Sequence, residues 1–235
     1  QREEVVNETL PGKVEIVDIG IPLVAEDSAD IDLFLSEEDD IREVIPARPV
    51  DSHKGDFGKV TVVGGSRGFT GAVVMACESA LAAGSGLVSA SVPASLNSIF
   101  ETKLTEAMSR LLDDSAAPGS FCPEVVSELA DWINDSMDAA AIGPGLGSGD
   151  SAGEFVRNLV KALDVPLVLD ADGLNAFAGK AEQLTLCGVP LVVTPHPGEM
   201  SRLSGLSMDE IKKAPITVAR DFAASHCCVT VLKGA

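Results

Sequence analysis

The sequence is short of positive charge and of aromatic residues. It has no tyrosine and one tryptophan, and its 17 lysines and arginines face 36 aspartates and glutamates. The resulting net charge of −19 argues against nucleic-acid binding, which needs a basic face, and against an anionic membrane surface. It leaves a phosphate-bearing ligand open, because a few local donors suffice to bind one.

Patterns of secretion, membrane spanning and metal binding are also missing. No signal-peptide pattern opens the chain, no apolar run approaches the length of a membrane-spanning helix, and the three histidines are not spaced as metal ligands. The cysteines form no Cys-X-X-Cys pair and are odd in number. We therefore expect a cytoplasmic protein with reduced thiols and no directly assigned metal ligand.

Short apolar segments alternate with helical patterns along most of the chain. Alternation of this kind predicts a parallel α/β sheet, and six countable strands favour an αβα sandwich over an eight-stranded barrel. The strands are expected at 60–63, 86–93, 139–142, 166–169, 190–194 and 228–232. Helices are expected at 70–84, 94–110, 122–137, 151–163 and 208–226, the last with a break at Pro215.

Three side chains are expected to cap helices. Thr70 would begin the helix that ends near Gly84, and Ser36 would begin a short helix that stops before Pro46. Asp172 is expected to cap a short helix after the strand at 166–169.

The stretch 60–84 organises the chain, because a buried strand is followed by a glycine-rich turn and a helix. Such a turn can bind an anion or be only a tight turn, and Arg67 within it can reach a phosphate or only solvent. Ligands of parallel sheets bind beyond the carboxyl ends of the strands. That edge would collect Gly64–Gly71, Gly143–Gly149, Asp170–Asn175, His196–Glu199 and Lys233.

These motifs, taken in order, resemble the ADP-dependent NAD(P)H-hydrate dehydratases, a branch of the ribokinase-like superfamily. The resemblance covers roughly residues 46–235 and implies a ribokinase-like three-layer αβα sandwich with a mostly parallel central sheet. Residues 12–22 resemble the end of an NAD(P)H-hydrate epimerase domain. The expected organisation is therefore an epimerase remnant at 1–25, an acidic linker with a short helix at 26–45, and an incomplete dehydratase domain at 46–235.

The resemblance also implies a reaction. Such enzymes phosphorylate the ring hydroxyl of S-NAD(P)H hydrate with ADP and eliminate phosphate, which restores NAD(P)H and releases AMP. It implies Mg²⁺ and ADP, or ATP, as cofactor and co-substrate, and a homo-oligomer, in many members a tetramer. The parent protein would be bifunctional, with an epimerase.

Site residues follow from the same resemblance. The hydrate would contact Ala72, Gly71, Gly145, Gly147 and His196. The nucleotide would contact Lys233, Gly234 and Ala235. Because they are polar residues at strand ends, three further residues are expected to support the ligand contacts indirectly or to bind the waters of Mg²⁺: Asp170, Asn175 and Glu199.

The catalytic residue implied by the resemblance is an aspartate in a Gly-X-Gly-Asp turn, expected downstream of Ala235. We therefore expect these 235 residues alone to be inactive. Two other functions stay open: a ribokinase-like kinase of a small vitamin-precursor alcohol, and a non-catalytic nucleotide-binding fragment.

Overall fold

A computed structural model describes residues 17, 19–20, 32–45 and 47–234. Most of the expected epimerase remnant, 1–25, and Ala235 of the nucleotide segment lie outside the described residues. The chain divides into two units, residues 1–50 and 51–235. The expected domain boundaries stay a prediction.

The first unit contains one described helix, α2 (Glu38–Val44). The prediction that Ser36 caps it was wrong, because the N-cap residue is Glu37. The backbone N–H of Glu37 donates to the Asp40 carboxylate at 2.8 Å, which starts the helix one residue later than expected. On the exposed surface of α2, the Arg42 guanidinium forms an ion pair with the Glu38 carboxylate at 2.6 Å.

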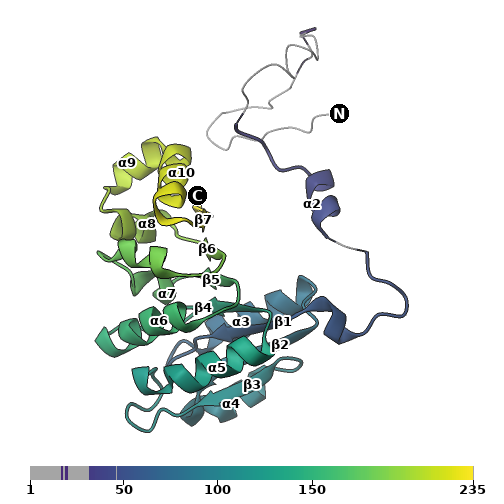
Figure 1. Ribbon diagram of the computed structural model, residues 1–235, viewed down its shortest axis with the longest axis vertical. Coiled ribbons are helices and arrows are strands. Elements are labelled where there is room, and N and C mark those ends of the chain that lie inside the picture. The colour runs from purple at the N-terminus through teal and green to yellow at the C-terminus, as the bar shows by residue number, and fades with distance from the viewer. Residues whose placement is uncertain (1–16, 18, 21–31, 46, 235) are drawn as a thin grey trace. The chain divides into compact units, whose positions relative to one another are not determined.

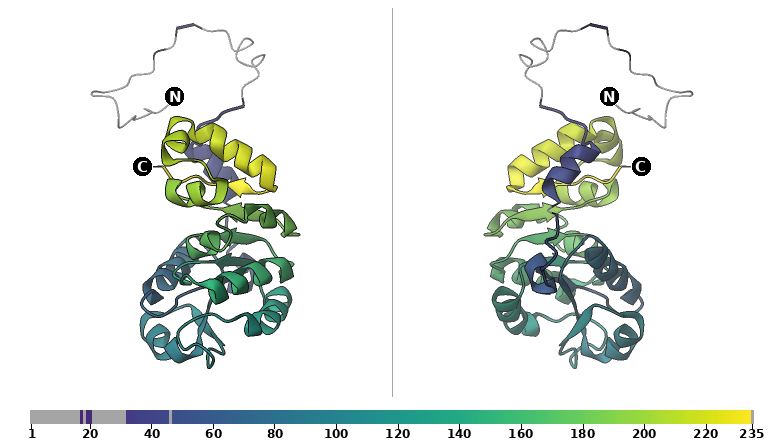
Figure 2. Two further views of the ribbon diagram at one scale, coloured as in Figure 1. Left: turned by 90° about the vertical axis from the view of Figure 1, so that its left-hand side faces the viewer. Right: turned by 90° about the vertical axis from the view of Figure 1, so that its right-hand side faces the viewer.

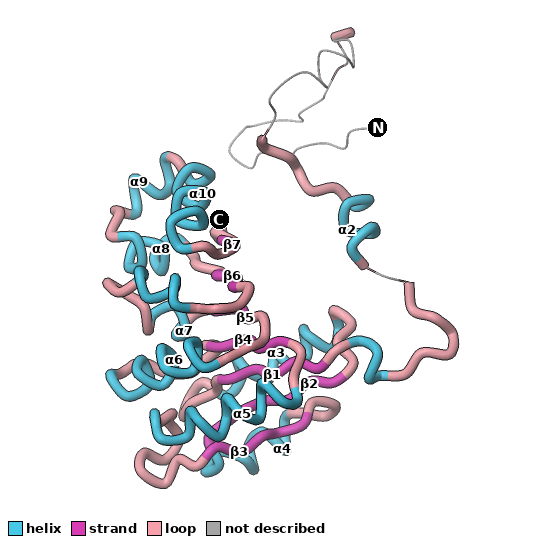
Figure 3. The backbone as a smooth tube through the Cα atoms, in the orientation of Figure 1, coloured by secondary structure: helices cyan, strands magenta, loops and turns pink. Residues whose placement is uncertain are grey.

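The second unit is built on a seven-stranded sheet in which every pair of neighbouring strands is parallel. The strand order is β3-β2-β1-β4-β5-β6-β7, which Figures 1 and 3 show as a stack along the molecule. The strands are β1 (Lys59–Val63), β2 (Leu87–Pro93), β3 (Met108–Leu112), β4 (Ala139–Ile142), β5 (Leu167–Leu169), β6 (Leu191–Val193) and β7 (Val229–Thr230).

The strand β3 was missed by the sequence reasoning, which assigned residues 94–110 to one helix. The helical part ends at Lys103, and Met108 begins a strand that pairs with Ser89 of β2. As an edge strand, β3 is only partly buried, so it lacks the continuous apolar run that marks the central strands. The sheet thus has one strand more than expected.

Helices cover the sheet on both faces, as Figure 2 shows at the β1–β3 end. One apolar core joins α3 and α4 to β1 and β2, and a larger one joins the other helices to the opposite face. The α-helices are α3 (Thr70–Ala82), α4 (Asn97–Lys103), α5 (Val126–Ser136), α6 (Asp150–Ala162), α7 (Asp172–Asn175), α8 (Pro197–Ser204), α9 (Met208–Lys213) and α10 (Pro215–His226). The predicted three-layer sandwich is confirmed.

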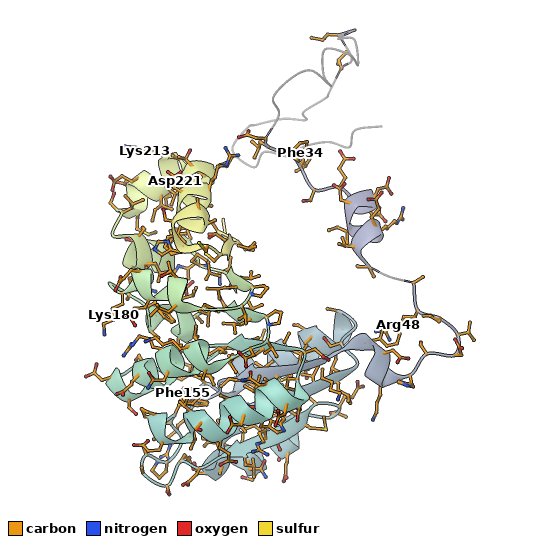
Figure 4. All side chains as sticks on the ribbon, in the orientation of Figure 1. Phe34, Arg48, Phe155, Lys180, Lys213 and Asp221 are labelled. Atoms are coloured by element: carbon orange, nitrogen blue, oxygen red, sulfur yellow. The ribbon has the colours of Figure 1, made fainter. Side chains whose placement is uncertain are left out.

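The larger core is centred on phenylalanine and leucine side chains beneath α5 and α6. Phe155 on α6 is fully buried and its ring lies 5.1 Å from that of Phe121 (Figure 4). Each such side chain contributes about 1.5–3 kcal/mol by leaving water. This rigid core fixes the strands whose carboxyl ends carry the candidate site.

Two further expected caps were wrong. The N-cap of α3 is Phe69, and Thr70 is its first helical residue, whose hydroxyl accepts a hydrogen bond from the Lys103 ammonium at 3.1 Å. The N-cap of α7 is Ala171, with φ 48°. The carboxylate of Asp172 instead accepts a hydrogen bond from the Gly147 backbone at 2.9 Å, because the two strand ends lie side by side.

Candidate functional site

Two glycine-rich turns lie against each other beyond β1 and β4. The backbone N–H of Ser66 donates to the carbonyl of Gly145 at 2.7 Å, and that of Gly65 donates to Pro144 at 3.0 Å. Gly145 has φ +59°, and a Cβ there would lie 2.5 Å from the Phe69 carbonyl oxygen and 3.2 Å from the Ala72 Cβ. The structure therefore places Ala72 and Gly145, both expected to contact the hydrate, next to each other.

Gly71 and Gly147 lie at the same pair of turns. Gly71 is exposed, and nothing lies within 4 Å of the place where its Cβ would be. Gly147 has φ +92°, and its would-be Cβ lies 3.0 Å from the Ser66 hydroxyl. Four of the five expected hydrate contacts thus come together on two neighbouring strand ends.

A second group of polar side chains gathers beyond β5, β6 and β7. The Lys233 ammonium lies 2.7 Å from the Asp170 carboxylate and 3.9 Å from that of Glu199. The Lys233 backbone N–H donates to Pro195 at 2.9 Å, which fixes the start of this segment. Gly234 follows and is exposed.

Burial and hydrogen bonding shift the pKa of Asp170 in opposite directions. Burial raises its pKa, but hydrogen bonds from Lys233 and Thr194 outweigh that effect, so the pKa lies below its ordinary value. The Thr194 hydroxyl donates to Asp170 at 2.8 Å. Sequence reasoning assigned no role to Thr194, although it opens the 194–199 motif.

His196 begins α8 as its N-cap residue. Its Nδ1 accepts hydrogen bonds from the backbone N–H groups of Gly198 at 2.9 Å and Glu199 at 3.2 Å. In return, the buried Glu199 carboxylate accepts from the His196 N–H at 2.8 Å. The other ring nitrogen, Nε2, lies 3.4 Å from the Glu199 carboxylate, and the His196 side chain as a whole is half-exposed.

The side chain of Asn175 has other hydrogen-bond partners than those of Asp170 and Glu199. Its amide donates to Asp172 at 3.2 Å and accepts from Arg202 at 2.9 Å. It lines a pocket of ≈ 280 Å³ beside the second glycine turn, with Lys180 at the outer edge of the molecule (Figure 4). The pocket is lined by Gly147, Ser148, Gly149, Asp150, Gly153, Arg157, Asp172, Asn175, Ala176, Ala178 and Lys180.

The described part of the chain contains no cluster of three or more His, Cys, Asp or Glu side chains that could hold a metal ion. It also contains no helix that is both long and apolar enough to cross a membrane. The five cysteines are free, and burial raises the pKa of the Cys77 thiol to about 12. The candidate site is therefore the polar edge of the sheet.

The sequence model of the NAD(P)H-hydrate dehydratase family matches residues 60–235, which contain both glycine turns and the polar strand ends. The chain belongs to the NAD(P)H-hydrate dehydratase family. The family resemblance and the fold class predicted from the motifs are thereby confirmed.

Two curated members of the dehydratase group show the extent of the similarity. The chain is 39% identical over 229 residues to the bifunctional NAD(P)H-hydrate repair enzyme of Moorella thermoacetica, covering 97% of this chain and 42% of that protein. It is 34% identical over 196 residues to the ADP-dependent (S)-NAD(P)H-hydrate dehydratase of Neisseria meningitidis, covering 81% and 60%. The chain thus spans less than two thirds of these relatives.

Solved structures agree with the fold. The ADP/ATP-dependent NAD(P)H-hydrate dehydratase of Bacillus subtilis, co-crystallised with ATP and Mg²⁺, superimposes with a TM-score of 0.66 at 28% identity. The match covers 84% of this chain and 65% of that one. A ribokinase-like protein of Enterococcus faecalis shares the fold, with a TM-score of 0.67.

Proposed function

We propose that a protein containing this chain catalyses the ADP-dependent dehydration of S-NAD(P)H hydrate to NAD(P)H. The observation that carries the proposal is that the two glycine turns and the polar side chains around Lys233 lie at the same edge of the sheet in a member of this family. The glycine turns pack Gly145 against Phe69 and Ala72 and leave Gly71 exposed beside them, and Lys233 presents an ammonium beyond β7. The glycine turns suit the hydrated nicotinamide ring, and the lysine suits nucleotide phosphates.

The charges around Lys233 support the binding of a nucleotide. Its ammonium has three donors, of which the Asp170 carboxylate takes one at 2.7 Å. The pair keeps the lysine extended toward the edge of the sheet, where a phosphate of ADP, or ATP, would accept from the remaining donors. Phosphoryl transfer needs positioning and charge neutralisation more than covalent chemistry, which suits this arrangement.

A nucleotide-bound Mg²⁺ fits this edge only as a partner of phosphates. Mg²⁺ keeps several waters and takes one or two carboxylates in addition to substrate phosphates. Asp170 and Glu199 are the two described carboxylates near Lys233 that would hold it, through those waters. Bound there, the ion would neutralise phosphate charge.

The hydrogen bonds of the His196 ring support the binding of the hydrate. Because two backbone N–H groups donate to Nδ1, that nitrogen carries no proton and the neutral ring carries it on Nε2. The Nε2–H lies 3.4 Å from the Glu199 carboxylate on a half-exposed side chain, and from there it would donate to the hydrate. Gly145 is buried against Ala72, so the open side of these turns is at the exposed Gly71, where nothing lies within 4 Å of the would-be Cβ.

The test is a reaction of the purified full-length protein with NADH hydrate or NADPH hydrate and Mg²⁺, with ADP and ATP in separate reactions. We expect the absorbance of the reduced nicotinamide to return and AMP to appear when ADP is present. A reaction without nucleotide is the control. No return of absorbance would overturn the proposal, and phosphorylation of a small vitamin-precursor alcohol by the same sample would replace it.

The wider organisation is part of the proposal. We infer a bifunctional parent protein with an epimerase preceding the dehydratase, because the bifunctional repair enzyme of Moorella thermoacetica aligns with 97% of this chain. A cytoplasmic homo-oligomer is proposed as well. Light scattering on the full-length protein tests the oligomeric state. Conversion of the R epimer of the hydrate to the S epimer tests the presence of the epimerase.

A further inference from the structure

Two positively charged side chains flank the first glycine turn. Arg67 is the single basic residue within the turns 64–71 and 143–149. Lys103, from the last turn of α4, donates to the Thr70 hydroxyl at 3.1 Å. Both side chains are exposed, so they meet solvent beside the exposed Phe69, at the rim of the first glycine turn.

Arg67 is held by backbone rather than by acid groups. Its N–H donates to the Gly119 carbonyl at 2.9 Å, and its Nη2 donates to the Pro118 carbonyl at 3.2 Å. Gly119 has φ +83°, and a Cβ there would lie 3.0 Å from both Cβ and Nε of Arg67. The loop is therefore shaped around the arginine and restricts its side chain.

The loop itself is pinned by a buried carboxylate. Asp114 accepts from the Gly119 N–H at 2.6 Å, and from the N–H and hydroxyl of Ser95. Asp114 is 5% exposed, and its oxygens are used by these three donors. It positions Gly119, and through Gly119 it positions the guanidinium.

In the part of the chain that the structure describes, no carboxylate pairs with either cation. Among the described residues, no ion pair involves Arg67 or Lys103, although acidic residues outnumber basic ones by two to one. A guanidinium has five donors in a planar fork that matches phosphate oxygens, and one of the five is used here. A fixed cation that has no counter-ion among the described residues, beside the candidate site, favours an anionic ligand.

We propose that Arg67, assisted by Lys103, binds a phosphate group of the dinucleotide part of the hydrate. The inference rests on the proposed function, which supplies the dinucleotide. The pyrophosphate is common to both hydrates, whereas the 2′-phosphate is present only in the NADPH form. Because Arg67 lies two residues before Phe69 at the rim, it would act on substrate affinity and not on the phosphoryl transfer near Lys233.

The experiment compares wild-type full-length protein with Arg67→Gln, Arg67→Lys and Lys103→Gln. Glutamine retains a donor for the Pro118 carbonyl but lacks the charge, so it separates phosphate binding from loop anchoring. Lys161→Gln, on the exposed last turn of α6, removes one charge at the end of that helix far from the glycine turns and is the matched control. Calorimetry measures the Kd of NADH and NADPH, and kinetics measure KM and kcat for each hydrate and for ADP.

We expect Arg67→Gln to weaken NADPH binding about tenfold or more, the loss that follows from removing one charged hydrogen bond. Lys103→Gln should have a smaller effect, Arg67→Lys should restore part of the affinity, and Lys161→Gln should bind as wild type. The KM for ADP should not change. An equal loss for NADH and NADPH would assign the pyrophosphate, and a loss confined to NADPH would assign the 2′-phosphate.

Three outcomes would overturn the inference: unchanged affinity of Arg67→Gln for both dinucleotides, an effect on ADP alone, or no binding of NADPH by wild type. Raised salt should weaken wild-type binding more than that of Arg67→Gln, because screening acts on the charge. Binding needs no turnover. A protein that binds NADPH through Arg67 but does not dehydrate the hydrate would therefore overturn the proposed function alone.

Discussion

The Lys233 ammonium lies 2.7 Å from the Asp170 carboxylate across 63 residues of sequence. The two residues follow β7 and β5, which are separated in the sheet by β6. Parallel strands bring their carboxyl ends to one edge, so the pair and Glu199 form one charged group there. The following predictions concern this edge and the loops that support it.

Lys233→Met should weaken ADP binding more than hydrate binding. Removing the ammonium takes away the proposed phosphate donor, and we expect the KM for ADP to rise about tenfold or more. Stability should change by at most about 1 kcal/mol, because the ion pair is partly exposed. Lys213→Met, on the exposed end of α9 (Figure 4), is the matched control. A normal KM for ADP in Lys233→Met would contradict the assigned role.

His196→Asn and His196→Ala should separate capping from substrate contact. Asparagine is a good N-cap residue, so we expect His196→Asn to keep the stability of α8, whereas His196→Ala should lose about 1 kcal/mol. Both variants lack the Nε2–H donor, and both should raise the KM for the hydrate. Urea unfolding measures the first effect and steady-state kinetics the second. Full activity of either variant would leave His196 a structural cap only.

Asp114→Asn should destabilise the protein near neutral pH by about 1–3 kcal/mol. The backbone N–H groups of Gly119 and Ser95 donate to different oxygens of Asp114, and an amide has only one oxygen, so one backbone donor would lose its partner. Ser115→Ala, at the exposed neighbouring position, is the control.

The effect of Asp114→Asn should depend on pH in one direction. Burial raises the pKa of Asp114, but hydrogen bonds from Gly119 and Ser95 outweigh this effect and lower it. A lowered pKa stabilises the folded state above the ordinary carboxyl pKa of about 3.9, and this stabilisation is lost as the pH falls through the folded value. Urea midpoints should thus differ at neutral pH and converge in acid. A difference that grew in acid would contradict this.

Gly145→Ala and Gly71→Ala should have opposite effects on stability. Gly145 has φ +59°, which costs alanine about 1–2 kcal/mol, and its Cβ would lie 2.5 Å from the Phe69 carbonyl. Gly71 lies in α3 with open space around it, so alanine should stabilise by up to about 1 kcal/mol. If Gly71 allows close approach of the hydrate, Gly71→Ala will be stable but have a raised KM. Thermal melts and kinetics on the same samples test both points.

The elements that the sequence predicted well are those buried on both faces. Strands β1 and β4 follow continuous runs of small and β-branched residues, and α6 follows a clear amphipathic pattern. Strand β3 was missed because its exposed edge position leaves Met108 and Leu111 partly in solvent, which weakens the pattern. The cap at Ser36 was wrong because the local pair of Glu37 and Asp40 begins the helix one residue later. The caps at Thr70 and Asp172 were wrong because their side chains contact residues that are distant in sequence, Lys103 and Gly147.

The sequence by itself determined the alternation of strands and helices and the motifs at the strand ends, because local periodicity and turn residues are local properties. Only the tertiary structure decided which of those ends share contacts. Lys233 was predicted at the edge, but its pairing with Asp170 depends on the strand order. The anchoring of Arg67 by Gly119, which Asp114 holds in place, joins two loops whose contact no spacing in the sequence encodes.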